Sequence, residues 1–207
     1  MTDREIPPDH LLEDIKAATG MVNDFYQVAH TYPVSIMRNS TDNIKAGLLP
    51  WAKSGIRKSI FIKVPGITIN QIAHEMSHYS LRILTGNKPL PLWFDEGLAC
   101  YVSSMDFIGG AQNLKTAYQR NTLPNIISWK GLHGKFTWLY HMYLKKNTPL
   151  IYGQSFYMIE YLIDTYQHQH LLNFVKHADA MEFDDSFKRS FGISQDIFYR
   201  NFLNTLQ

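Results

Sequence analysis

The feature that most constrains the fold of this chain is the segment His74–His78, which reads H-E-x-x-H. Residues four apart on an α-helix differ by about 40° in azimuth, so the two imidazoles face the same way only if the segment is helical. Glu75 is then offset by about 100° from His74. Two neutral imidazoles can bind one zinc ion, and a neighbouring carboxylate can accept a proton from a zinc-bound water. The segment therefore predicts a helix that carries part of a zinc site.

Chance is a weak explanation for this motif. With nine His and six Glu in 207 residues, the expected number of such pentapeptides is about 0.01. The flanking sequence agrees with a helix, because no Pro or Gly occurs between residues 67 and 85 and apolar residues surround the motif. We expect this helix to run from Thr68 to about Thr85 and to stop at Gly86.

A catalytic zinc ion usually has three protein ligands and a water, so two histidines leave the site one ligand short. The segment 93–99 reads W-F-D-E-G-L-A and lies in a helix that is expected over about 92–104. Asp95 and Glu96 are the only acids on that helix, and one glycine with two prolines between 86 and 91 allows it to fold back against the first helix. We expect Glu96 to be the third ligand; the alternative is a carboxylate that faces solvent.

The remaining pattern predicts an α+β fold. Short runs of β-branched or aromatic residues, bounded by Pro, Gly, Ser and Asn, indicate strands at Val34–Met37 and Ser59–Val64. Glycines and a proline interrupt the periodicity of residues 105–149, so loops and short helices are expected there. Apolar residues at steps of three and four predict further helices at 11–29, 151–166, 168–177, 183–191 and from 195 onward.

H-E-x-x-H followed after seventeen residues by Glu96, within W-F-D-E-G-L-A, resembles the gluzincin zinc metallopeptidases, most closely their peptidase MA-like branch. The segments Tyr152–Ser155 and Phe187–Ile193 are similar to the C-terminal half of that branch. The resemblance covers most of the chain from about residue 10. It implies a zincin-like α+β fold with a small N-terminal sheet, an active-site helix, a mostly helical C-terminal lobe and one zinc ion at the junction. We therefore expect a single metallopeptidase domain over 1–207, with an N-terminal lobe at about 8–85 and a helical lobe at about 90–207.

Carried over residue by residue, the resemblance makes His74, His78 and Glu96 the zinc ligands and Glu75 the general base. Tyr152 matches the tyrosine that opens the equivalent helix in the aminopeptidase relatives, where its hydroxyl stabilises the oxyanion.

Two positions depart from the relatives. Asp95 stands where the aminopeptidases usually have Asn, and their Gly-Ala-Met-Glu-Asn exopeptidase motif is absent. Cys100 stands where thermolysin-type relatives carry an Asp that orients a ligand histidine, so the group that orients the ligands must come from elsewhere.

These residues together predict zinc-dependent hydrolysis of a peptide bond, with a peptide or protein as substrate. An exposed edge of the strand Ser59–Val64 could pair with an extended substrate. The alternative is a catalytically weak zinc-binding protein of this fold that acts as a peptide- or protein-binding module. A helical scaffold with an accidental motif is disfavoured by the joint presence of the three ligands, and an intact Glu75 favours the enzyme.

Composition excludes several other functions. Lys and Arg number 20 against 18 Asp and Glu, a net charge of +2, and no stretch is strongly basic, so neither nucleic acid nor acidic lipid is an expected partner. No window of eighteen uninterrupted apolar residues predicts a membrane segment. The single Cys100 cannot form an intrachain disulfide or a cysteine-based zinc cluster. A cytoplasmic location is expected if Met1 is the native start, and an extracytoplasmic one if a leader was removed; the oligomeric state is left open.

Five histidines lie outside the motif in the C-terminal half of the chain. None repeats the spacing of the pair, so we expect surface or structural roles for them, with adventitious metal binding as an alternative for His168 and His170. The five are His133, His141, His168, His170 and His177.

Overall fold

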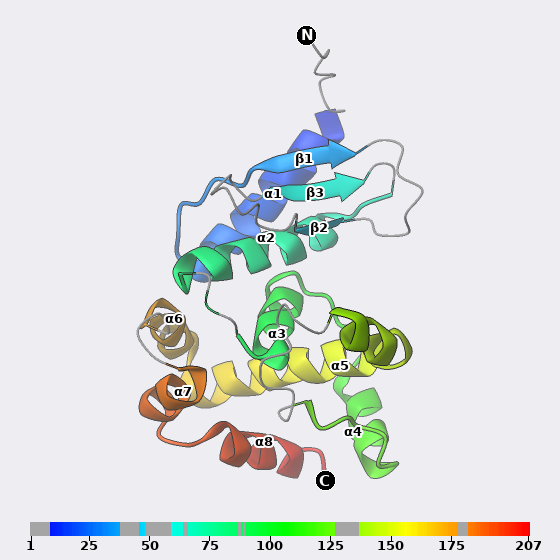
Figure 1. Ribbon diagram of the computed structural model, residues 1–207, viewed down its shortest axis with the longest axis vertical. Helices are drawn as coiled ribbons and strands as arrows, with labels where there is room; N and C mark the ends of the chain where they lie inside the picture. Colours follow the sequence, from blue (N-terminus) through cyan, green and yellow to red (C-terminus); the bar gives the residue numbers. More distant parts are fainter. Residues whose placement is uncertain are drawn as a thin grey trace. The chain divides into compact units, whose positions relative to one another are not determined.

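The structure is a computed structural model that describes residues 9–37, 46–48, 59–63, 66–86, 88, 90–126, 137–177 and 182–207. Over 137–148 it describes the backbone alone, so the side chains of His133 and His141 lie outside the described part. Contacts divide the chain into two compact units, Met1–Ser80 and Leu81–Gln207, and the boundary falls within one helix. Figure 1 shows the elements of both units.

The first unit contains a three-stranded sheet and two helices. The helices are α1 (Asp9–Tyr26) and α2 (Ile69–Leu84), the latter ending in the second unit. The strands are β1 (Val34–Met37), β2 (Ala46–Leu48) and β3 (Ile60–Lys63). Their order is β1-β3-β2: β1 runs parallel to β3, with Val34 opposite Ile60, and β2 runs antiparallel to it, with Ala46 opposite Ile62.

The central place of β3 corrects one expectation. A peptide was expected to pair with an exposed edge of the strand at Ser59–Val64, but β3 is bonded on both sides, to β1 and to β2. The backbone groups of a strand in this position are used within the sheet, so β3 has no open edge to offer. The hypothesis is therefore wrong.

The core of the first unit consists of apolar residues that recur at the spacing of a strand or a helix. Ile60 and Ile62, two apart on β3, share one face of the sheet and are both fully buried. The buried residues of α1 recur at intervals of four and seven positions, as expected for one face of a helix, and those of α2 lie around the motif. They are Leu11, Ala18, Val22 and Tyr26 on α1, and Ile72, Ala73 and Met76 on α2.

Helix α1 ends three residues earlier than predicted. Gln27 has a φ of 52°, in the left-handed region, and the N–H of Val28 donates to the carbonyl of Asn23 at 3.0 Å. This 6→1 hydrogen bond is that of a Schellman motif, in which a residue with positive φ closes the helix. The usual Gly is missing at this position, so the sequence pattern did not reveal the end.

The second unit contains six helices among its described residues. They are α3 (Leu92–Val102), α4 (Ala111–Gln119), α5 (Thr137–Tyr166), α6 (His168–His177), α7 (Phe183–Phe191) and α8 (Gln195–Asn204). Aromatic rings form much of its core. Trp93 stacks on Phe198 with ring centroids 5.6 Å apart, and its indole N–H donates to Gln195 Oε1 at 2.9 Å. This hydrogen bond satisfies the one polar atom of a fully buried side chain.

Helix α5 differs from its prediction. A helix was expected to begin at Ile151, after Pro149, but α5 begins at Thr137 and contains Pro149. A proline removes one backbone hydrogen bond from a helix. The Pro149 side chain is exposed. No helix within the described residues has the length and apolarity needed to cross a bilayer.

Candidate metal centre

Helix α2 begins at a reciprocal pair of side-chain hydrogen bonds. The N–H of Gln71 donates to Thr68 Oγ1 at 3.3 Å, and the N–H of Thr68 donates to Gln71 Oε1 at 3.1 Å. This capping box satisfies two of the donors that a helix start leaves unpaired. The helix start is therefore fixed six residues before His74, as the sequence predicted to within one residue.

The two histidines of the motif share one face of α2. His74 and His78 are 8% and 7% exposed, and their rings meet edge to face with centroids 4.8 Å apart. Glu75 is half-buried on the neighbouring face of the same helix. The structure thus places the motif as the helical geometry requires, with both imidazoles together and the carboxylate beside them.

The imidazoles also converge through the correct atoms. His74 Nε2 and His78 Nε2 lie 3.2 Å apart. Two nitrogens held at roughly 2.0–2.1 Å by one tetrahedral zinc ion lie about 3.3 Å apart. The separation in the structure therefore matches what one zinc ion demands of two histidine ligands.

A polar network on α2 packs against the end of α1 and the segment that follows it. Tyr26 Oη lies 2.7 Å from Ser77 Oγ, and Tyr32 Oη lies 2.7 Å from Ser80 Oγ. His30 Nδ1 lies 3.1 Å from the same Ser80 hydroxyl. Both serines are fully buried. Because Ser77 and Ser80 flank His78, these hydrogen bonds fix the rotation of the helix that carries it.

The donor and acceptor of each hydrogen bond in this network follow from the last acceptor, Asn23 Oδ1. The Tyr32 hydroxyl donates to Asn23 Oδ1 at 2.9 Å, so it must accept from Ser80, which in turn accepts from His30 Nδ1–H. Burial raises the pKa of Tyr32 to about 12, so the phenol keeps its proton. Burial lowers the pKa of His30 below its ordinary 6.5, which favours the neutral imidazole.

Helix α3 carries Glu96 and is buried almost all round. It begins after Pro91, whose carbonyl accepts from the N–H groups of Phe94 and Asp95 at 3.0 Å each. Every residue of the helix except Tyr101 is buried, including Asp95 and Glu96, which are 6% and 9% exposed. The reading of Glu96 as a carboxylate facing solvent is therefore wrong. A buried carboxylate is costly unless hydrogen bonds, charges or a metal ion stabilise it.

Gly97 lets α3 lie directly on α5. A Cβ atom at position 97 would lie 2.6 Å from the Ser155 carbonyl oxygen and 2.8 Å from Ile159 Cγ1. Contacts this short do not occur with a real Cβ, so only glycine fits. The residue that follows Glu96 in the sequence thus sets how closely its helix approaches α5.

Cys100 lies one turn after Glu96 and is fully buried. Burial, followed by the negative charges of Glu96 and Asp106, raises the pKa of the Cys100 thiol well above its ordinary value. The thiol therefore stays protonated and acts as a small apolar group.

His74, His78 and Glu96 could hold a metal ion. Each offers one ligand atom. Two imidazoles and one carboxylate are the donor set of catalytic zinc sites that keep a fourth position for water. Imidazole nitrogens disfavour calcium and magnesium, which take oxygen ligands.

Tyr152, the predicted oxyanion residue, lies in α5 three residues after Pro149. It is half-buried, and its ring packs edge to face on Phe107 with centroids 5.1 Å apart. The catalytic roles predicted for Tyr152 and Glu75 stay predictions.

The serine network was missed by the sequence reasoning. A weak signal was present, since Ser77 and Ser80 are polar residues within a helix whose neighbouring positions are largely apolar. Their partners, however, come from residues 48 to 51 positions away, and no local pattern announces them.

Comparison with known proteins agrees with this geometry. The family model described as Peptidase MA superfamily matches residues 65–206, which include both α2 and α3. Neither the curated proteins nor the solved structures contain a match to this chain. Because the family model spans about two thirds of the sequence, the chain belongs to the Peptidase MA superfamily.

Proposed function

We propose that this protein is a zinc-dependent metallopeptidase, a hydrolase that cleaves peptide bonds, with one zinc ion per chain in a zincin-like fold of the gluzincin type. The observation that carries the proposal is the 3.2 Å separation of the two Nε2 atoms of His74 and His78. The motif occurs in a chain of the Peptidase MA superfamily and in a group with Glu96 that could hold a metal. We treat residues 1–207 as a single metallopeptidase domain.

His74, His78 and Glu96 are the proposed zinc ligands. A zinc ion bound there would polarise the scissile carbonyl and lower the pKa of a water from about 15.7 to about 7. The two imidazoles must be neutral to bind, and their positions on one helix give them the correct separation before binding. Little reorganisation of α2 is then needed when the metal enters.

Glu75 is the proposed general base. It lies beside the ligand histidines on α2 and is half-buried. It accepts the proton of the attacking water and passes it to the amine that leaves, so that no proton is gained or lost over the reaction. A step of this kind contributes about 10²- to 10⁴-fold to the rate.

Tyr152 is the proposed donor to the oxyanion. Its phenol O–H would donate a hydrogen bond to the oxygen of the scissile carbonyl as negative charge develops there. The packing of its ring on Phe107 restricts the positions that its hydroxyl can take.

One pair of measurements tests the proposal: zinc content by elemental analysis, and cleavage of a diverse peptide library. We expect one zinc per chain in the wild type and in Glu75→Gln, no zinc in His74→Ala, and cleavage by the wild type but by neither of these two variants. His10→Ala and Glu13→Gln are matched controls, because both residues are exposed on α1. They repeat the substitutions of His74→Ala and Glu75→Gln outside the motif.

The outcomes separate the proposal from its alternative. Zinc without cleavage in the wild type would indicate a catalytically weak zinc-binding protein that binds peptides or proteins. A wild type that binds no zinc contradicts both readings. Cleavage that survives Glu75→Gln would contradict the role of Glu75 and leave the metal site intact.

A further inference from the structure

Residues 103–110 form the loop between α3 and α4, and the end of α3 fixes where this loop begins. Ser104 has a φ of 54°, in the left-handed region, and the N–H of Met105 donates to the carbonyl of Cys100 at 2.9 Å. This 6→1 hydrogen bond is that of a Schellman motif, which ends a helix and sets the direction in which the chain leaves it. The 103–110 loop is therefore attached firmly to the helix that carries Glu96.

Asp106, within this loop, uses both of its carboxylate oxygens. Its Oδ1 accepts from the N–H groups of Ile108 at 3.0 Å and Gly109 at 3.1 Å, which closes the loop on itself as an Asx turn. Its Oδ2 accepts from the Tyr157 hydroxyl of α5 at 2.7 Å. Burial, followed by this hydrogen bond, raises the pKa of Tyr157, so the phenol keeps the proton that it donates. One side chain thus shapes the loop and ties it to α5.

The next two residues of the loop pack on α5 beside the proposed oxyanion donor. The Phe107 ring meets the Tyr152 ring edge to face, with centroids 5.1 Å apart and an interplanar angle of 86°. Ile108 lies on Gly153, where a Cβ atom would come within 2.7 Å of Ile108 Cγ1 and Cγ2. Glycine therefore allows the loop to approach the α5 backbone next to Tyr152. From α4, Asn113 Nδ2 donates to the Ile108 carbonyl at 2.6 Å and holds the loop there.

We propose that Asp106 is a positioning residue for Tyr152. A functional side chain must be held within about 0.5 Å and 10–20° of its working geometry. Because Tyr152 is half-buried, its orientation depends on the contacts of its buried part, and Phe107 provides one of them. Asp106 holds Phe107 against the ring, so the Tyr152 hydroxyl has a defined position before a substrate binds. The inference rests on the proposed function, since this position matters only if the hydroxyl donates to an oxyanion.

Nuclear magnetic resonance of the full chain, labelled with ¹³C in its tyrosine rings, tests the positioning directly. The Tyr152 ring signals are identified by their loss in Tyr152→Phe. Asp106→Asn leaves too few acceptors for both the loop N–H groups and Tyr157, and Tyr157→Phe removes the same bond from its other end. Both variants should shift the Tyr152 ring signals, because the ring current of Phe107 depends on how the two rings meet.

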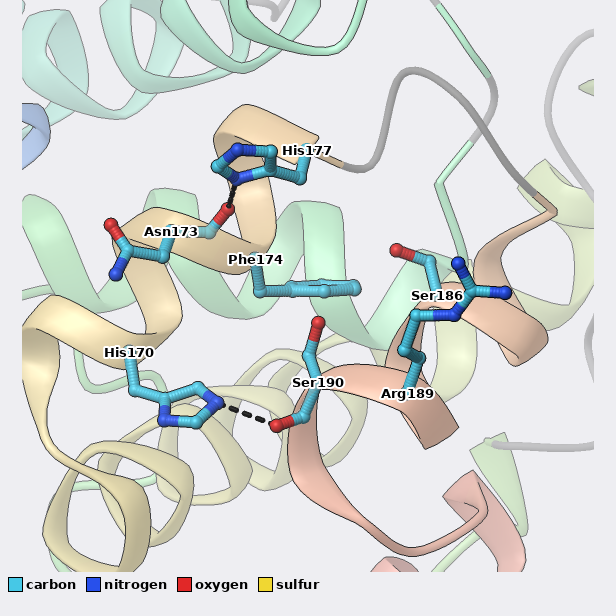
Figure 2. A pocket seen from close by; sticks show the side chains of 7 residues that line it. All are labelled: His170, Asn173, Phe174, His177, Ser186, Arg189 and Ser190. Atoms are coloured by element: carbon cyan, nitrogen blue, oxygen red, sulfur yellow. Dashed lines mark hydrogen bonds between the residues drawn. The ribbon is translucent and has the colours of Figure 1, made fainter.

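Two control variants separate positioning from loss of charge and from a general loss of stability. Asp164→Asn removes an exposed carboxylate of α5 that, like Asp106, raises the pKa of Glu160, so it repeats the change of charge nearby. His170→Ala removes the hydrogen bond of His170 Nε2 to the Ser190 carbonyl, which joins α6 to α7 (Figure 2). Neither control should shift the ring signals.

The outcomes of this measurement are opposed. Tyr152 signals that stay in place in Asp106→Asn or in Tyr157→Phe would overturn the proposal. Equal shifts in either control would overturn it as well, because the effect would then come from charge or from stability. Shifts confined to the two test variants support it.

Kinetics of peptide cleavage test the consequence for the reaction. Asp106→Asn and Tyr157→Phe should each lower kcat by about 10- to 10²-fold with little change in KM, since the hydroxyl is misplaced in the transition state. In the Tyr152→Phe background the same changes should alter kcat by less than about twofold, because the misplaced hydroxyl is already absent. An equal loss of kcat in both backgrounds would show a general structural role and contradict the proposal.

The two readouts separate the failure of this inference from the failure of the proposed function. If the wild type cleaves no peptide while the ring signals shift as expected, the proposed function fails and the positioning of Tyr152 by Asp106 stands. If the wild type cleaves peptides and the ring signals stay in place, the positioning fails and the proposed function stands.

Discussion

Gly97 and Ser155 approach so closely that a Cβ atom at position 97 would lie 2.6 Å from the Ser155 carbonyl oxygen. The side chain of alanine cannot be accommodated unless the backbone of α3 or α5 shifts. We expect Gly97→Ala to lower the free energy of unfolding by about 1–3 kcal/mol, measured by denaturant titration.

Gly20 provides the control for this substitution. It lies within α1, and a Cβ at this position would meet nothing within 4 Å. Gly20→Ala should therefore stabilise the protein by about 0.5–1 kcal/mol through the higher helix propensity of alanine. A similar change in both variants would contradict the argument from close packing.

The bond between Ser80 and Tyr32 should be measurable by a double-mutant cycle. Ser80→Ala leaves the half-buried Tyr32 hydroxyl without its donor and should cost about 1 kcal/mol of unfolding free energy. Tyr32→Phe should cost a similar amount, and the two changes together less than their sum, by about 0.5 kcal/mol or more. Strict additivity would show that the two hydroxyls do not interact.

His30 should make the stability depend on pH. Burial lowers its pKa in the folded state below the ordinary 6.5, so below pH 6.5 the unfolded state binds more protons. The contribution is fully present above about pH 6.5 and is lost as the pH falls toward the folded pKa. Unfolding free energies at several values from pH 7.5 to 5 should fall less in His30→Gln than in the wild type.

His10→Gln is the matched control, because His10 is exposed on α1. It should leave the pH profile of the wild type unchanged. An identical profile in the His30 variant would contradict the assignment.

Tyr152→Phe tests the oxyanion role. If the hydroxyl acts in the transition state, kcat should fall by about 10²- to 10³-fold while KM changes little. Tyr118→Phe, on α4, removes a half-buried hydroxyl elsewhere in the same unit and should leave kcat unaltered. An undiminished kcat in the first variant would remove Tyr152 from the mechanism.

Removal of the metal should lower the thermal stability. A ligand present at about 1,000 times its dissociation constant stabilises the folded state by about 4 kcal/mol. A chelator should therefore lower the Tm of the wild type and of His10→Ala, and leave that of His74→Ala unchanged. A chelator that has the same effect on all three would indicate that the motif does not bind the ion.

The sequence predicted the parts of the fold that have strong local signals. The start of α2 was found because the apolar residues around the motif and the lack of Pro and Gly between residues 67 and 85 agree, and the capping box seen in the structure lies at the same point. The strand β2, Ala46–Leu48, was missed because three residues that include a glycine have little strand propensity, and its pairing with β3 is what defines it.

The candidate site was predictable to a similar degree. The spacing of His74 and His78 fixes their separation through helix geometry alone. The sequence did not predict the burial of Asp95, and the close contact of Gly97 with Ser155 depends on a helix 58 positions away in the sequence. The packing between the helices is thus the part of the site that could not be predicted from the sequence.

The central position of β3 restricts the motion of α2, the helix that carries His74 and His78. To expose its amides to solvent exchange, β3 must separate from β1 and β2 at once, so these amides should be among the slowest to exchange in the first unit. Since α2 begins only six residues after β3 ends, the helix is tethered to the most persistent strand of the unit. Local unfolding of the first unit would then begin in segments other than β3 and the start of α2. The separation of the His74 and His78 imidazoles would stay constant while those other segments fluctuate.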